Sequence, residues 1–134
     1  MLQKFVYWTG MSDFLVGAGT WAGAIAIVMA DEPLKGQFVP LITLGTFLMM
    51  AAALLMWSSH DMVNRAPVFF WQGLVRLSAI SAVIYAVPNQ LAETWEYALL
   101  AIDGPIGLVY VLGAVKVTGC SFGQLLTGKT APQA

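Results

Sequence analysis

The chain has 134 residues, of which 59% are hydrophobic and 10% are charged, and its formal net charge is −1. Soluble domains are about 45–50% apolar and about 25% charged, and a chain this short has too much surface to hide such an apolar excess from water. The near-neutral charge excludes the basic patch of a nucleic-acid-binding protein. A single cysteine and a single histidine exclude an intramolecular disulfide and a histidine metal cluster. The composition therefore predicts an integral membrane protein.

The first predicted membrane-spanning helix covers residues 13–30. It approaches the ~20 residues needed to cross about 30 Å of hydrocarbon, and it carries no charge after Asp13. Ser12 is the predicted N-cap of this helix, because its hydroxyl can accept a bond from a free backbone N–H group. Residues 1–12, with apolar side chains around Lys4, are predicted to lie on the membrane surface.

One face of this first span consists of small residues. Gly19 and Gly23 are four residues apart, and Trp21 lies between them. Such a face lets two helices approach closely, so it serves either packing within the protein or a contact with another protein. Trp21 is also a candidate ligand-binding residue.

Three further spans are predicted, over residues 38–58, 67–88 and 94–116. Their long apolar stretches lack the two-residue alternation of barrel strands, so they are predicted to be helices. Short polar connections place consecutive helices antiparallel. The predicted fold class is all-α: a polytopic membrane protein with an antiparallel four-transmembrane-helix bundle, forming a single membrane domain whose second surface segment covers residues 117–134.

The basic residues of the loops and termini predict the orientation of the protein. Four of them fall on one side of the predicted membrane: Lys4, Arg65, Lys116 and Lys129. The other side holds only Lys35, next to two acidic residues. Because basic residues mark the cytoplasmic side, we expect a multi-pass protein of the cell (inner or plasma) membrane with both termini in the cytoplasm.

Arg76 and Asp103 are charged residues inside the third and fourth apolar stretches. A charge at the centre of a membrane-spanning helix costs at least ~2.5–3.5 kcal/mol, so it usually faces the protein interior and finds a partner. Counted from the cytoplasmic ends of their spans, Arg76 lies about 12 Å deep and Asp103 about 18 Å deep. The sequence therefore predicts an ion pair, which either locks two helices together or takes part in binding or catalysis.

Other polar residues are spaced so that they share a face with this pair. Glu96, Asp103 and Tyr110 are seven residues apart, and Gln72 precedes Arg76 by four. The catalytic candidates are Asp103, Arg76 and Glu96. The ligand-binding candidates are Arg76, Asp103, Gln72, Tyr110 and Trp21. No metal site is predicted.

Pro105 follows Asp103 and Gly104 within the last span. A proline removes one backbone donor from a helix and frees the carbonyl four residues earlier. Broken helices beside a charge often line ligand or ion sites. The pattern predicts either a simple kink or a broken helix at this point.

The function predicted from these features is that of an accessory membrane subunit or a bundle that binds a hydrophobic ligand. The alternative is an intramembrane enzyme on a lipid, terpenoid or quinone-like substrate, with Asp103 as acid or base and Arg76 as its partner. A second alternative is a proton-linked carrier. No cofactor is predicted. The expected partners are the lipid bilayer, another membrane protein or a second copy of the chain, and a lipid-like ligand, but no nucleic acid.

Overall fold

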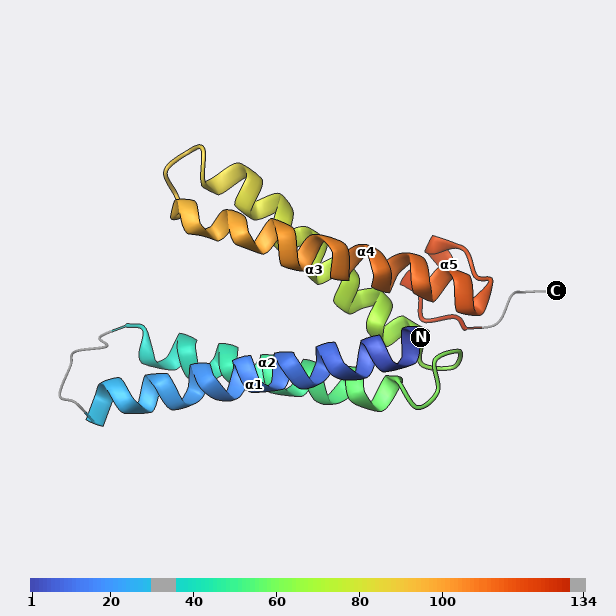
Figure 1. Cartoon of the computed structure of the whole chain (residues 1–134), viewed down its shortest axis with the longest axis horizontal. Helices are drawn as coiled ribbons and strands as arrows, with labels where there is room; N and C mark the ends of the chain where they lie inside the picture. The colour runs from blue at the N-terminus through green and yellow to red at the C-terminus, as the bar shows by residue number, and fades with distance from the viewer. Residues whose placement is uncertain (30–35, 131–134) are drawn as a thin grey trace. The chain divides into compact units, whose positions relative to one another are not determined.

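The computed structural model describes residues 1–29 and 36–130, and every regular element in this part of the chain is helical (Figure 1). Four segments are long and apolar enough to cross a membrane. They are α1 (Leu2–Met29), α2 (Phe38–Ser58), α3 (Ala66–Ala86), and the 3₁₀ helix η1 (Thr94–Tyr97) continued by α4 (Ala98–Thr118). The prediction of an all-α, multi-pass membrane protein is confirmed.

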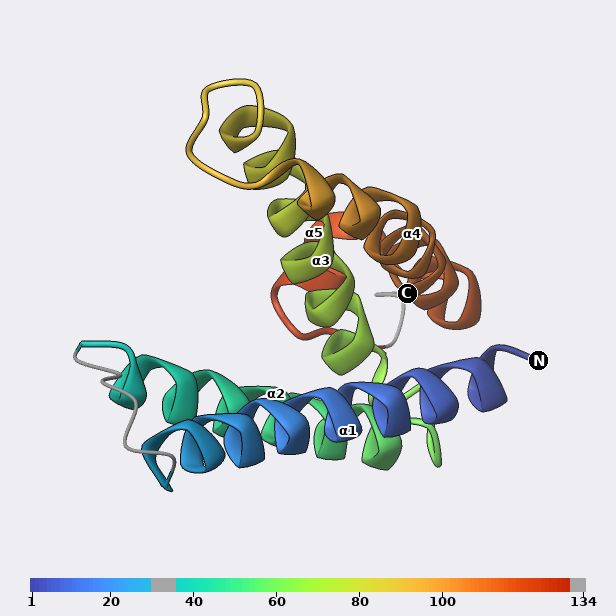
Figure 2. The ribbon, with the colours of Figure 1, turned by 60° about the vertical axis from the view of Figure 1, so that its left-hand side comes forward.

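The chain divides into two compact units, Met1–His60 and Asp61–Ala134. The first contains the helical hairpin α1–α2, and the second contains the hairpin α3–α4. In both views the two helices of each hairpin lie side by side (Figures 1 and 2). Most of the loop predicted between the first two spans lies outside the described residues. A single membrane domain over residues 1–134 stays a prediction.

Glycines bring α1 and α2 into close contact. A Cβ atom on Gly17 would lie 2.8 Å from the carbonyl oxygen of Gly45, and a Cβ atom on Gly45 would lie 2.8 Å from the carbonyl oxygen of Gly17. Seven residues away on both helices, a Cβ atom on Gly10 would lie 3.1 Å from the carbonyl oxygen of Ala52. These contacts define an antiparallel pair whose backbones touch because the side chains are absent.

The hairpin α3–α4 uses the same device. A Cβ atom on Gly73 would lie 2.9 Å from the carbonyl oxygen of Gly107, and the reverse distance is 3.1 Å. Close by, the ring centroids of Phe69 and Tyr110 are 6.3 Å apart in an edge-to-face arrangement, and both side chains are fully buried. Glycine contacts and aromatic packing together fix the register of this pair.

The first helix is longer than predicted. α1 begins at Leu2 and runs without a break to Met29, so the prediction that Ser12 caps its N-terminus is wrong. The residues before Ser12 contain no proline, and Gly10 is held against α2 rather than ending the helix. A started helix continues where nothing stops it, because each further residue adds a hydrogen bond.

The last span is also continuous. α4 runs from Ala98 to Thr118 with Pro105 inside it, so the helix is not broken there. Gly119 ends it in the left-handed conformation, with φ 69°. The short α5 (Phe122–Leu126) follows.

Two kinds of contact hold α5 in place. Ser121 caps it, because the Ser121 backbone N–H donates to Gln124 Oε1 at 2.8 Å and the Gln124 N–H donates to Ser121 Oγ at 3.4 Å. The ring of Phe122 packs edge-to-face on that of Phe70, with centroids 5.0 Å apart, and Leu125 is fully buried. Residues 121–127 are therefore packed and capped as part of the second unit.

Candidate functional site

An ion pair joins the two helices of the second unit. Arg76 Nη1 on α3 donates to Asp103 Oδ1 on α4, as the depths of the two residues in their spans predict. The side chains of Arg76 and Asp103 are 15% and 18% exposed, so the protein covers most of both charged groups. A guanidinium and a carboxylate in direct contact neutralise each other, which is the usual way for a membrane helix to carry a charge.

The glycine crossing explains why this contact forms. Gly73 precedes Arg76 by less than one helical turn, and Gly107 follows Asp103 by about one turn. Because the backbones of α3 and α4 touch at these glycines, the arginine side chain spans the remaining distance to the carboxylate. Sequence reasoning missed Gly73 and Gly107. The available signal was a glycine inside each apolar stretch, one turn or less from each charged residue.

Tyr110 belongs to the same site. It lies on α4 seven residues after Asp103, and its ring centroid is 6.0 Å from the guanidinium carbon of Arg76. A cation over an aromatic face gains about 0.5–1 kcal/mol at exposed sites and about 2 kcal/mol when desolvated. The prediction that Asp103 and Tyr110 share a face is confirmed, because both reach Arg76.

Gln72 and Glu96 are placed differently. Gln72 lies half-buried on α3, one turn before Arg76, and takes no part in the ion pair. Glu96 lies in η1, before α4 begins, so the seven-residue spacing does not place it on the α4 face. Its Oε1 accepts the backbone N–H of Glu93 at 3.1 Å, which caps η1. The structure thus gives Glu96 a capping role.

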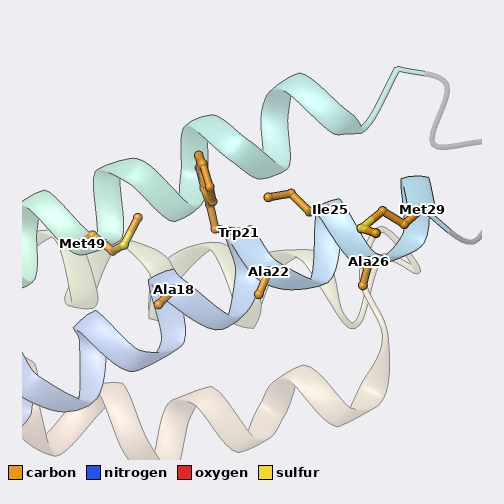
Figure 3. Close-up of a pocket in the computed structure, with 7 residues that line it drawn as sticks. All are labelled: Ala18, Trp21, Ala22, Ile25, Ala26, Met29 and Met49. Carbon is orange, nitrogen blue, oxygen red and sulfur yellow. The ribbon is translucent and has the colours of Figure 1, made fainter.

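Trp21 lies in the first unit, on α1, and lines a shallow apolar pocket of about 380 Å³ (Figure 3). Its indole Cδ1 would lie 3.3 Å from a Cβ atom on Gly45, so the ring packs over the glycine contact with α2. The rest of the pocket is also apolar and is formed by Ala18, Ala22, Ile25, Ala26, Met29 and Met49. Trp21 therefore belongs to the first unit, whereas Arg76 and Asp103 belong to the second.

Gly19 and Gly23 do not pack against α2. A Cβ atom on either residue would meet no heavy atom within 4 Å. Packing within the α1–α2 hairpin relies on Gly10, Gly17 and Gly45, so the interpretation of Gly19 and Gly23 as packing residues is wrong for this pair of helices. Within the described residues of the first unit, no heavy atom covers these two positions of α1.

The chemistry available at the Arg76 site follows from these contacts. A guanidinium bonded to one oxygen of a carboxylate competes with any proton donor or ligand for that oxygen. Within residues 1–29 and 36–130, no three histidine, cysteine, aspartate or glutamate side chains come together as a metal site. The arrangement is well suited to holding two helices in one register.

Searches against protein-family models, curated proteins and solved structures find no match for this chain. The chain is an all-α, multi-pass membrane protein with an Arg76–Asp103 ion pair between its third and fourth membrane-spanning segments.

Proposed function

We propose that this protein works by association, as an accessory subunit that binds another membrane-spanning helix along α1. The observation that carries the proposal is the small-residue surface of α1, which consists of Ala18, Gly19, Ala22, Gly23 and Ala26. These side chains are exposed or half-buried, and the two glycines touch nothing within 4 Å. The three alanines also line the apolar pocket in Figure 3.

The physical argument is one of close approach in lipid. Lipid tails are as apolar as leucine, so helices associate there through packing rather than through the hydrophobic effect. Residues at spacings of three and four occupy neighbouring positions on one side of a helix. Alanine and glycine at these positions let the backbone of a second helix come within van der Waals distance. The α1–α2 and α3–α4 contacts of this chain already show such close approach at glycines.

The Arg76–Asp103 pair supports the same proposal. Each charge is neutralised within the second unit, which favours a structural use for both residues. A hairpin fixed in one register by an ion pair is a stable platform for a subunit whose partner binds elsewhere on the chain.

The test enlarges the small-residue surface without touching α2. Ala22→Leu combined with Gly23→Leu adds two bulky side chains where a Cβ atom on Gly23 meets open space, so the fold should tolerate them. We expect gently extracted wild-type protein to appear by native mass spectrometry in a complex larger than its own 14.4 kDa, and the double variant to appear mainly as the single chain.

Thr20→Leu is the matched control. This variant places the same leucine side chain on α1 outside the small-residue surface and the pocket, and it removes a hydroxyl that donates to the Val16 carbonyl at 2.9 Å. This control should keep the complex. A wild-type protein that runs only as a single chain, or a double variant that keeps the complex, would contradict the proposal. A complex made only of this chain would identify the partner as a second copy.

A second candidate function is catalysis on a lipid-like substrate. It is favoured by one observation, the 15% and 18% exposure of Arg76 and Asp103, which leaves both reachable by a small group. Asp103 would then act as general acid or base, with Arg76 holding its charge. Turnover of a lipid, terpenoid or quinone by purified protein, lost in a folded Asp103→Ala variant, would replace the association proposal with this one.

The proposed orientation places both termini in the cytoplasm. It is supported by Lys4, Arg65, Lys116 and Lys129 at the ends of the spans that would share that side. Cysteine replacements at Gly36 and Asn64 should react with a membrane-impermeant reagent from opposite sides. The native Cys120 is 1% exposed and should contribute little background. Labelling of both replacements from the same side would rule the orientation out.

A further inference from the structure

A small polar pocket lies at one end of the first unit, where α1 begins and α2 has just ended. Its volume is about 210 Å³, and it is lined by Gln3, Lys4, Tyr7, Trp8, Ser59 and His60. Pockets for drug-sized ligands measure about 300–1,000 Å³, so this one suits a compact group rather than a whole lipid. All six residues belong to the unit Met1–His60.

The helix register sets the depth of this pocket. Gly17 lies opposite Gly45, and seven residues earlier Gly10 lies opposite Ala52. One more step of seven brings Gln3 opposite Ser59, directly after the last residue of α2. Because the 21 residues of α2 measure about 31 Å, close to the ~30 Å hydrocarbon thickness, the end of α2 falls at the level of the lipid head groups.

Aromatic residues near the pocket agree with this depth. Trp8 lines it and is 65% exposed, and Trp57, near the end of α2, is 50% exposed. Tryptophan and tyrosine concentrate at the boundary between lipid and water, where one end of the ring is apolar and the other is hydrated. The ring of Tyr7 meets that of Trp8 edge to face, with centroids 5.7 Å apart, which restricts the two side chains.

The side chains around the pocket suit an anion. Lys4 carries the only formal positive charge among the six lining residues, and none of the six has a carboxylate. The remaining side chains offer neutral donors: the amide of Gln3, the hydroxyl of Tyr7 and the indole N–H of Trp8. A compact anion with several acceptor oxygens satisfies this set, and a phosphate group has that chemistry.

The far wall of the pocket is fixed by hydrogen bonds to one carbonyl. Ser59 Oγ donates to the Met56 carbonyl at 2.7 Å, and His60 Nδ1 lies 2.9 Å from the same oxygen. With Nδ1 donating there, Nε2 is the ring nitrogen left for a ligand, as an acceptor in the neutral ring and a donor in the protonated one. The imidazole is thus held in one orientation at the pocket edge.

We propose that this pocket binds the phosphate of an anionic phospholipid, with Lys4 as the charge partner and Tyr7 and Trp8 as hydrogen-bond donors. The level of the pocket at the end of α2 favours a lipid over free phosphate, because a head group is already present there at high local concentration. The acyl chains then lie against the exposed apolar side chains of the hairpin. This inference is independent of the partner proposed for the small-residue surface.

The test compares lipids on the full-length protein. Purified protein is placed in nanodiscs containing equal amounts of phosphatidylglycerol and phosphatidylcholine, and native mass spectrometry counts the lipids that stay bound. We expect wild type to retain phosphatidylglycerol preferentially. Lys4→Gln should reduce that preference about fivefold, the effect of one basic residue at an anionic surface. Tyr7→Phe, which removes only a hydroxyl, should reduce it by a smaller factor.

Lys116→Gln is the matched control, because it removes the same charge at the end of α4, outside the pocket. An equal loss of preference in this control would reduce the effect to general surface charge and overturn the proposal. No preference in wild type would overturn it as well. Displacement of the bound lipid by millimolar inorganic phosphate, with no selection between the two lipids, would assign the pocket to free phosphate instead.

Discussion

The two hairpins solve the same packing problem with different residues. Both cross at a pair of glycines whose carbonyl oxygens lie within 2.8–3.1 Å of where the opposing Cβ atoms would be. In α1–α2 the crossing residues Gly17 and Gly45 are neutral, whereas α3–α4 adds the Arg76–Asp103 pair beside Gly73 and Gly107. Close approach in lipid therefore does not require charges, and the ion pair must contribute something other than proximity.

That contribution is best described as register. An ion pair is satisfied only when its two partners lie opposite each other, whereas a glycine face tolerates a shift along the helix more easily. Sliding α3 by one turn past α4 would leave Arg76 and Asp103 without partners inside the membrane. Each unpaired charge there costs roughly 2.5–3.5 kcal/mol.

The largest expected effect comes from removing one partner of the ion pair. Asp103→Asn leaves the Arg76 guanidinium without its countercharge, and breaking a buried pair in this way typically costs about 3–5 kcal/mol. Thermal unfolding in detergent should therefore shift clearly downward. The double variant Arg76→Leu with Asp103→Leu should recover most of the loss, because it removes both charges. An unchanged melting curve for Asp103→Asn would mean that the pair does not stabilise the hairpin.

A smaller effect is expected at the glycine crossings. Gly17→Ala and Gly73→Ala place a methyl group 2.8–2.9 Å from a backbone carbonyl oxygen, so the helices must separate, at about 1–3 kcal/mol. We expect both variants to lower the unfolding temperature, and by similar amounts if the two crossings are equivalent. A much larger loss in Gly73→Ala would show that separating α3 from α4 also breaks the ion pair.

Gly19→Ala provides the matched control, because the new methyl group meets no heavy atom within 4 Å. Alanine is favoured over glycine in a helix by about 0.8–1.0 kcal/mol, so this variant should be as stable as wild type or more stable. A loss equal to that of Gly17→Ala would show that the Gly19 face is packed after all.

The parts of the fold that composition determines were predicted well from sequence. The bounds of α2 agree with the predicted span 38–58, because an uninterrupted apolar stretch between polar loops leaves little freedom. The Arg76–Asp103 contact follows from similar depths on consecutive, neighbouring spans, since charges inside a membrane rarely go unpaired.

The parts that tertiary contacts determine were not predicted. Gly17 and Gly19 are equally plausible packing residues in the sequence, and only the position of α2 distinguishes them. Ser12 is a good capping residue by type, but α1 passes through it because no breaker precedes it. Glu96 has the right spacing from Asp103 but belongs to η1, where it caps the turn.

The length of α1 has a consequence for the membrane itself. Its 28 residues measure about 42 Å, well beyond the ~30 Å hydrocarbon core, whereas α2 matches that thickness. A long helix usually relieves such mismatch by tilting. Tilting α1 alone would pull Gly17 away from Gly45, so its surplus turns stay at the bilayer boundary. A thicker bilayer would immerse those turns of α1 first, while α2 would become too short to span it.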